Sequence, residues 1–318
     1  MKRNLLLAIL CIWAVTFQAQ TIKFGIISDI HPDIMFDGDE RLQKFLDEAQ
    51  KSKVDFIIEL GDFCQVKDAN RPFLKLWNDF EGKKYHVIGN HDLDVVDKND
   101  YIGFVGMPSR YYSFDEKGFH FIVLDPNNIL VNGKYRSPFR SGRYGDQIDA
   151  EQMEWLKKDL AATDKRCIVF SHQSFERVDA VKNAAAIREL FENENKRAGY
   201  TKVVAAFSGH DHTDYQKVIN GIAYIQINSA SNQWVGDTYK CEERYSEEIN
   251  KNHPYIQYTT PYKESIYAFV TIKKNTLNMK GKKSSFVPPT PEEMKIPASL
   301  YDGLPLVPYI SDYKFKFK

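Results

Sequence analysis

Short apolar segments alternate with longer amphipathic segments along most of the chain. The apolar segments, which predict β-strands, are residues 22–27, 54–60, 85–88, 166–170 and 203–207. The amphipathic segments, which predict helices, are approximately residues 39–52, 70–80, 147–161 and 179–197. Strands and helices that alternate at this spacing are typical of an α/β fold with a buried sheet.

Other segments depart from this alternation. Residues 111–114 and 119–124 are apolar or aromatic and are separated by a short polar turn, which predicts a β-hairpin. An irregular stretch is expected at 126–146. Two further β-rich stretches, and a polar and aromatic insertion between them, are residues 215–229, 266–280 and 231–262.

The C-terminal residues 284–318 contain six of the thirteen prolines of the chain. Proline interrupts both helices and central strands, but the many Leu, Val and Tyr side chains are too apolar for a disordered tail. We therefore expect an extended strap packed on the main domain, with an added edge strand at 313–318. No internal repeat or clear linker divides residues 21–283, which we interpret as one domain.

Residues 1–20 form a separate element. A short basic start precedes an almost unbroken apolar run at 5–17, as in a secretory signal peptide that is cleaved near residue 19 or 20. The run is shorter than the roughly 20 residues that a membrane-spanning helix needs. A lipid anchor at Cys11 is the competing interpretation, and it is disfavoured because the preceding residue is Leu10. We expect an exported protein, periplasmic or secreted, without a stable membrane anchor.

Composition excludes some classes of function. The chain has 318 residues, of which 43% are hydrophobic and 27% charged, and its mean hydropathy of -0.47 argues against a polytopic membrane protein. The 43 basic and 43 acidic residues balance, so nucleic-acid binding is not expected as the main role. Loss of the leader would leave three cysteines, too few for a disulfide framework. Oligomeric state is left open.

Five of the predicted strands end in potential metal ligands. These residues are Asp29 with His31, Asp62, Asn90 with His91, His172, and His210 with His212. A single His or Asp after a strand is more often a turn or capping residue than a ligand. Because sites assemble at the carboxyl ends of the strands in an open α/β sheet, five such ends in succession predict one shared site.

The ligand types indicate which metals would bind. Carboxylate, amide oxygen and imidazole together suit Mn, Fe, Zn or Ni, whereas all-oxygen sites suit Mg or Ca. About seven ligands exceed the needs of one ion. A pair of divalent ions about 3.5 to 4 Å apart, sharing a carboxylate, explains the number and is an arrangement used for phosphate ester hydrolysis.

These motifs resemble, in order and spacing, the five signature motifs of the calcineurin-like metallophosphoesterases. The resemblance covers about residues 21–230 and is greatest for an exported bacterial-type member. It implies a four-layer αββα sandwich with two central mixed β-sheets, and a dinuclear metal centre at the strand ends. Residues 21–283 would then be the catalytic domain.

The resemblance also implies a role for each site residue. The ligands would be, for the first ion, Asp29, His31 and His212, and for the second, Asn90, His172 and His210. Asp62 would bridge the two ions. His91 would contact the scissile phosphate and protonate the leaving group, and Asp92 would orient its imidazole. The reaction would be in-line attack on phosphorus by a metal-bridging hydroxide.

Departures from subfamily patterns narrow the function. Purple acid phosphatases have a tyrosine ligand where this chain has Gln65, and protein Ser/Thr phosphatases have an Asp-Arg-Gly that residues 63–65 lack. We expect a phosphomonoesterase or phosphodiesterase acting on a small-molecule phosphate ester. A nucleotide or phosphoalcohol pyrophosphatase is the alternative. A non-catalytic binding protein is least favoured, because such proteins should lose ligands.

Two segments are candidates for substrate recognition. Residues 134–144 combine basic and aromatic side chains, and Arg136, Arg140 and Arg143 are candidate phosphate contacts. A solvated charged loop is an equally good interpretation of this segment. The insertion at 231–262, with Trp234, Tyr239, Tyr245, Tyr255 and Tyr258, is expected either to form another wall of the site or simply to pack.

Overall fold

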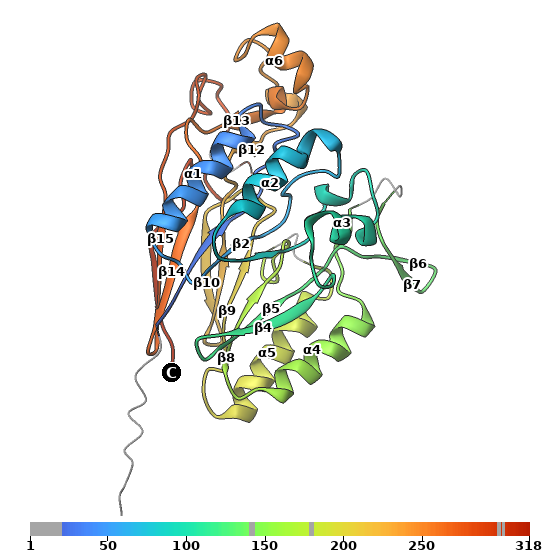
Figure 1. Ribbon diagram of the computed structural model, residues 1–318, viewed down its shortest axis with the longest axis vertical. Coiled ribbons are helices and arrows are strands. Elements are labelled where there is room, and N and C mark those ends of the chain that lie inside the picture. The colour runs from blue at the N-terminus through green and yellow to red at the C-terminus, as the bar shows by residue number, and fades with distance from the viewer. Residues whose placement is uncertain (1–20, 140–143, 178–180, 298–299, 301–302) are drawn as a thin grey trace, which may run out of the picture.

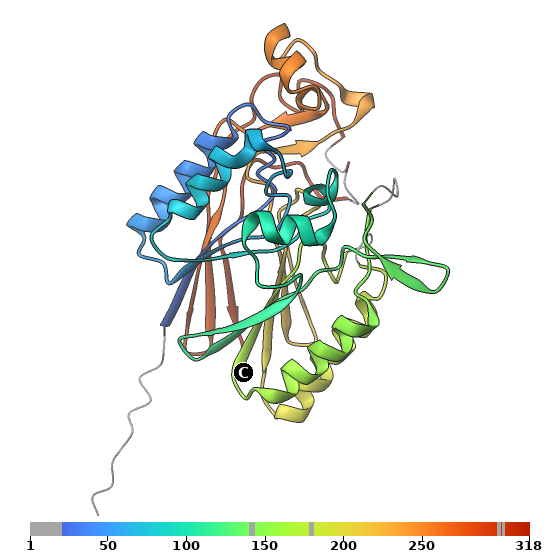
Figure 2. The ribbon, with the colours of Figure 1, turned by 45° about the vertical axis from the view of Figure 1, so that its right-hand side comes forward.

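The computed structural model describes residues 21–139, 144–177, 181–297, 300 and 303–318. Two six-stranded sheets lie face to face, and helices cover their outer faces (Figures 1 and 2). This arrangement confirms the expected four-layer αββα sandwich. The predicted signal peptide at 1–20 lies outside the described residues.

The first sheet is mixed and has the order β16-β15-β14-β1-β2-β3. Its strands are β1 (Thr21–Ile27), β2 (Phe56–Glu59), β3 (Lys83–His86), β14 (Ala268–Lys273), β15 (Thr276–Gly281) and β16 (Tyr313–Lys316). Strands β1, β2 and β3 are parallel, whereas β14, β15 and β16 add antiparallel neighbours. The C-terminal strand β16 therefore forms an edge of this sheet, as predicted.

The second sheet is also mixed and has the order β10-β11-β9-β8-β5-β4. Its strands are β4 (Tyr112–Glu116), β5 (Phe119–Val123), β8 (Arg166–Phe170), β9 (Val203–Ser208), β10 (Tyr215–Ile219) and β11 (Ile222–Gln226). The central strands are parallel, and each edge is completed by an antiparallel hairpin partner, β4 or β10.

Helices pack on the outer face of each sheet. Helices α1 (Gly38–Lys51), α2 (Arg71–Asp79) and α3 (Lys98–Val105) share an apolar cluster with the first sheet. Helices α4 (Ala150–Ala162) and α5 (Ala184–Ala198) share another with the second sheet. Among the described residues, no helix combines the length and the apolar character that crossing a membrane requires.

Alternating side chains of the central strands build the core. Phe24 and Ile26 of β1 point into the cluster between the two sheets, whereas Ile27 joins the cluster under the helices. In β2, Phe56 points into the cluster between the sheets, and Ile57 joins the cluster under the helices. Since both faces of these strands are buried, they appear in the sequence as continuous apolar runs.

Three parts of the structure differ from the expected pattern. Residues 126–146 contain a hairpin of β6 (Ile129–Val131) and β7 (Lys134–Arg136). Helix α3 was not predicted; it begins at the side-chain cap of Asp97 and ends at Gly106, whose φ is 79°. The insertion forms the two-stranded ribbon β12 (Asn232–Trp234) and β13 (Thr259–Pro261), with α6 (Glu247–Asn252) between them.

Four short 3₁₀ helices complete the described elements. They are η1 (Asp68–Asn70), η2 (His91–Leu93), η3 (Asp237–Tyr239) and η4 (Ile256–Tyr258). Of these, η2 carries a candidate catalytic residue.

Candidate metal centre

The loops that follow β1, β2 and β3 of the first sheet meet those that follow β8 and β9 of the second. The backbone N–H of Asp29 donates to the carbonyl of Gly61 at 3.1 Å, which joins two loops of the first sheet. The imidazole of His172 reaches across from the second sheet and donates from Nδ1 to the carbonyl of Leu60 at 2.7 Å. All seven predicted ligands therefore come from loops at the facing ends of the two sheets.

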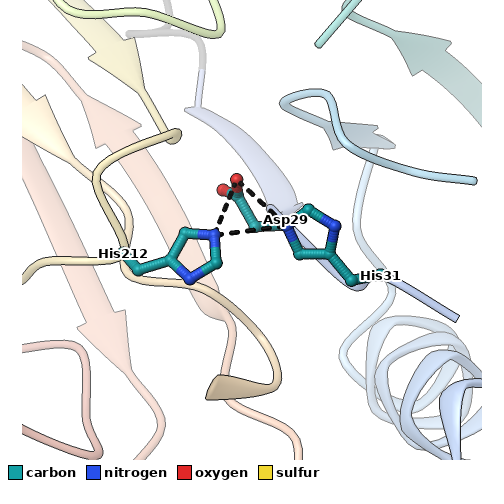
Figure 3. Close-up of side chains that lie close together, drawn as sticks. All are labelled: Asp29, His31 and His212. Carbon is teal, nitrogen blue, oxygen red and sulfur yellow. Dashed lines mark hydrogen bonds and ion pairs between the residues drawn. The ribbon is translucent and has the colours of Figure 1, made fainter. Parts of the chain in front are cut away.

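Asp29, His31 and His212 form the first group of potential ligands (Figure 3). The Nε2 atoms of His31 and His212 are 3.2 Å apart, and each faces Oδ1 of Asp29, at 3.9 and 3.3 Å. The same Oδ1 atom is buried and has no hydrogen-bond partner. Two ring nitrogens and an unsatisfied carboxylate oxygen directed at one point fit a metal ion.

Asp62, His172 and His210 form the second group. Nε2 of His172 lies 3.2 Å from Oδ2 of Asp62 and 3.0 Å from Oδ1 of Asn90. Oδ2 of Asp62 is also 3.7 Å from Nε2 of His31, which belongs to the first group. The Asp62 carboxylate thus lies between the two groups, where a bridging ligand would be.

Backbone strain is concentrated in the candidate ligands. Five of the seven have positive φ angles of 50° to 71°, namely Asp29, His31, Asp62, His210 and His212. For residues other than glycine, this conformation costs about 1–3 kcal/mol each and persists only where the surrounding structure enforces it. The loops are therefore held in a conformation that places the side chains and not in the one of lowest backbone energy.

Two glycines allow the ligand loops to approach closely. A Cβ atom on Gly89 would overlap the backbone nitrogen and Oδ1 of Asp62, and one on Gly209 would overlap Oγ of Ser28 and lie 2.6 Å from Oδ2 of Asp29. Any side chain at these positions would therefore displace a carboxylate of the centre.

The charges of the site favour a cation. Burial would raise the pKa of Asp29, but His212 and His172 lower it to about 2. Burial lowers the pKa of His31 to about 3, so its ring is neutral and keeps a lone pair for a metal. For His172 burial acts the same way, yet Asp62 and Asp29 raise its pKa to about 10. The carboxylates thus attract positive charge at this position, as the donor set of a divalent ion should.

His91 is next to the two groups and lines the cavity in front of them. Its Nδ1 donates to Oδ2 of Asp94 at 2.9 Å, and its backbone N–H donates to Oδ1 of Asp62 at 2.8 Å. Residues i and i+3 of a 3₁₀ helix share a face, which brings Asp94 under the imidazole. This contact was not anticipated.

The expected contact between Asp92 and the His91 ring is wrong. The ring bonds Asp94 instead, and the side chain of Asp92 is fully buried and accepts four backbone N–H bonds. The donors, at 2.7 to 3.2 Å, are Asp62, Phe63, Cys64 and Gly89. Asp92 therefore holds together the two loops that carry Asp62 and Asn90.

A cavity of about 850 Å³ opens in front of the centre. Beside His91 and five of the candidate ligands (His31, Asp62, Asn90, His210 and His212), its lining includes Asp33, Lys67, Asp94, Tyr144, Arg177, Asp211, Trp234 and Tyr255. The insertion therefore does contribute to the wall, through Trp234 and Tyr255. Tyr144 belongs to the predicted 134–144 segment, so one aromatic side chain of that segment does reach the cavity. Arg177 was not predicted, because nothing in the sequence pattern distinguishes its loop.

Of the predicted phosphate contacts in the 134–144 segment, the structure describes Arg136. Arg136 is exposed on the β6–β7 hairpin and is not among the residues that line the cavity. Arg140 and Arg143 lie outside the described residues.

Comparisons with known proteins agree with this geometry. A curated Arabidopsis thaliana protein, "Manganese-dependent ADP-ribose/CDP-alcohol diphosphatase", is 27% identical over 207 residues, 51% of this chain and 66% of that protein. The chain thus spans just under two thirds of that relative. A dimetal phosphatase from Danio rerio has a TM-score of 0.59 at 14% identity, covering 84% of this chain and 99% of that one.

The fold is also shared with a protein of another description. GAP50, the anchor in the inner membrane complex of Plasmodium, has a TM-score of 0.52 at 15% identity, covering 94% of this chain and 90% of that one.

A family model described as calcineurin-like phosphoesterase matches residues 22–214, more than half of the chain. The chain therefore belongs to the calcineurin-like phosphoesterase family.

Proposed function

We propose that this protein hydrolyses phosphate esters with two divalent metal ions. The observation that carries the proposal is the pair of buried ligand groups with the Asp62 carboxylate between them. When bound, two such ions supply Lewis acidity toward phosphoryl oxygens and an activated water nucleophile at neutral pH. Asp29, His31 and His212 would hold one ion.

The second ion would be held by Asn90, His172 and His210, with Asp62 shared. The mixture of imidazole and oxygen donors suits Mn, Fe, Zn or Ni. Manganese is our first choice, because the Arabidopsis relative is named as manganese-dependent. The Nδ1–H of His172 donates to the Leu60 carbonyl, so Nε2 is the nitrogen that would lose its proton and bind the ion.

A residue of the chain would also protonate the leaving group. His91 lines the cavity, and its Nδ1–H is held by Asp94, so Nε2 is the nitrogen free to give a proton to the departing oxygen. Lys67 and Arg177 are the Lys and Arg side chains among the described lining residues.

A diphosphatase is the second candidate function. It is favoured by the Arabidopsis relative, whose name gives ADP-ribose and CDP-alcohols as substrates.

A purely structural role is less favoured. GAP50 is described as an anchor and shares the fold, so the fold alone does not imply catalysis. The complete ligand set argues for catalysis in this chain.

The test is hydrolysis of p-nitrophenyl phosphate and of bis(p-nitrophenyl) phosphate by the purified protein, with Mn²⁺ and with EDTA. We expect turnover with Mn²⁺ that EDTA abolishes and that Asn90→Ala lowers at least about 100-fold, because the variant loses a metal ligand. Asn99→Ala, on the exposed start of α3, is the matched control. Turnover in EDTA, or full activity of Asn90→Ala, would contradict the proposal.

We also propose that the protein is exported and loses its leader. The support is the pattern of residues 1–20, a basic start followed by an apolar run too short to span a bilayer. N-terminal sequencing of the protein from cell fractions should find a periplasmic or secreted chain that begins near residue 20. A cytoplasmic chain that keeps residue 1, or a lipid-modified Cys11, would refute it.

A further inference from the structure

We propose that Trp234 and Tyr255 form a stacking surface for a planar aromatic ring of the substrate, beside the phosphate site. The inference rests on the proposed function, because the metal centre defines where the phosphate would be. It deepens that function by giving the class of group attached to the phosphate.

The two rings are exposed in a protein that leaves few of its described aromatic side chains exposed. Trp234 is 38% exposed and Tyr255 58% exposed, and both line the cavity that contains His31, His91 and His212. Exposed apolar surface inside a cavity, next to convergent polar groups, is typical of a ligand site.

The surface is supported from behind. The Trp234 ring stacks on Tyr258, with ring centroids 5.7 Å apart and planes 24° apart, and Nζ of Lys240 lies 5.5 Å from the centroid of Tyr258. Tyr255 lies 6.4 Å from both rings. Tyr258 thus supports one face of the Trp234 ring, and Trp234 also lines the cavity, where a ligand ring would be.

The segment that carries Trp234 is tied to the metal-ligand loops. Ser229 Oγ donates to the Asp29 carbonyl at 2.8 Å, and Ser231 Oγ donates to the Ile30 carbonyl at 2.7 Å. Gln233 Nε2 donates to the His212 carbonyl at 3.0 Å. These three side chains, at alternate positions of one segment, thus fix the backbone next to Trp234 relative to the centre.

The charges of the lining favour a ring over a second anionic group. Lys67 is paired with Asp33 at 3.1 Å, and Arg177 with Asp211 at 3.4 Å. Asp94 adds another carboxylate to the same cavity. A further phosphate away from the metals would meet these acids, whereas a neutral aromatic ring gains stacking energy without a charge partner.

The ring has two possible sources, a nucleobase or a simple aryl ester, and tryptophan fluorescence tests both. Among the described tryptophans, Trp77 is fully buried, and Trp155 is on α4, in contact with Tyr111. We expect AMP, phenyl phosphate or both to quench the fluorescence of the Mn²⁺-loaded protein on mixing, and ribose 5-phosphate not to do so. AMP alone would identify a nucleobase, and phenyl phosphate alone an aryl group.

Variants assign the signal. Trp234→Phe should abolish the quenching, whereas Trp155→Phe, the matched control, should keep it. Trp234→Ala should lower the ratio of kcat/KM for the aromatic ester to kcat/KM for ribose 5-phosphate by about 5- to 150-fold, the range of one base–aromatic stack. Trp155→Phe should not change that ratio.

Equal quenching by ribose 5-phosphate, quenching that survives Trp234→Phe, or an unchanged ratio in Trp234→Ala would each overturn the stacking surface. These results are separable from failure of the proposed function. A protein that hydrolyses esters with an unchanged ratio has the metal centre without the stacking surface. A protein that hydrolyses no ester but shows Trp234-dependent quenching has the surface without the activity.

Discussion

The carboxylate of Asp94 holds the imidazole of His91, with 2.9 Å between Oδ2 and Nδ1. The contact keeps a proton on Nδ1 and leaves Nε2 on the cavity side. It spans one turn of η2, so the two residues share a face although two others separate them in sequence. Asp92, the residue directly after His91, instead accepts backbone N–H bonds from the neighbouring loops.

Replacing Asp94 with Asn should lower kcat by about 10- to 100-fold, because the imidazole loses the charge that orients it. The free energy of unfolding should hardly change, since Asp94 is exposed. Steady-state kinetics with bis(p-nitrophenyl) phosphate and urea unfolding measure the two effects. Gln65→Ala, which removes the other partner of Asp94, is the control and should have the smaller effect on kcat.

Replacing Asp92 with Ala should act mainly on stability. Four buried N–H groups would lose their acceptor, which should lower the free energy of unfolding by at least about 2 kcal/mol. Urea unfolding in EDTA gives the value without a contribution from metal binding. If Asp92→Ala were as stable as the wild type but inactive, a direct catalytic role would be indicated instead.

Metal content should distinguish Asp62 from Asp29. Asp62→Ala removes an oxygen between both ligand groups and should weaken the binding of both ions, whereas Asp29→Ala should weaken mainly the first. Calorimetric titration of the metal-free variants with Mn²⁺ measures this. Two ions retained by Asp62→Ala with wild-type affinity would rule out the bridge.

The pH dependence of stability should contain a contribution from His120, far from the centre. Burial would lower its pKa, but hydrogen bonds to Asp159 and Asp115, at 2.8 Å each, raise it. A pKa that is higher in the folded than in the unfolded state stabilises the protein below the unfolded value of about 6.5, and this stabilisation is lost as the pH rises through the folded value.

The measurement compares His120→Gln with the wild type by urea unfolding from pH 6 to pH 9. The destabilisation caused by the substitution should be largest at the acidic end and should shrink toward the alkaline end. Asp159→Asn, which removes one partner, should reduce the wild-type pH dependence. A difference that grows with pH would have the wrong sign.

Much of the fold and the candidate ligand set could be predicted from the sequence, because both depend on regular strands. Four of the five strands, β1, β2, β8 and β9, are mainly apolar, and each ligand follows its strand within four residues. Strand β3 (Lys83–His86) is polar and begins earlier than the apolar run at 85–88 predicts. Asp94 and Arg177 are different. Their positions depend on turn geometry and on loop paths set by contacts far away in the sequence, which no local periodicity records.

Helix α3 escaped prediction for a similar reason. Its eight residues present no clear apolar face, and only the Asp97 cap and Gly106 mark its ends. The insertion was predicted as a possible wall, but which of its aromatic rings reach the cavity is decided by the β12–β13 pairing. Trp234 and Tyr255 do so, whereas Tyr239, Tyr245 and Tyr258 are not among the lining residues.

Asp29 and His212 face each other from different sheets, although 183 positions of the chain separate them, so each ion would be clamped between the two halves of the sandwich. Sliding one sheet over the other would pull both coordination spheres apart. Metal affinity should therefore report the alignment of the two sheets. A distant substitution in the apolar layer between them could abolish metal binding while every ligand is still in place.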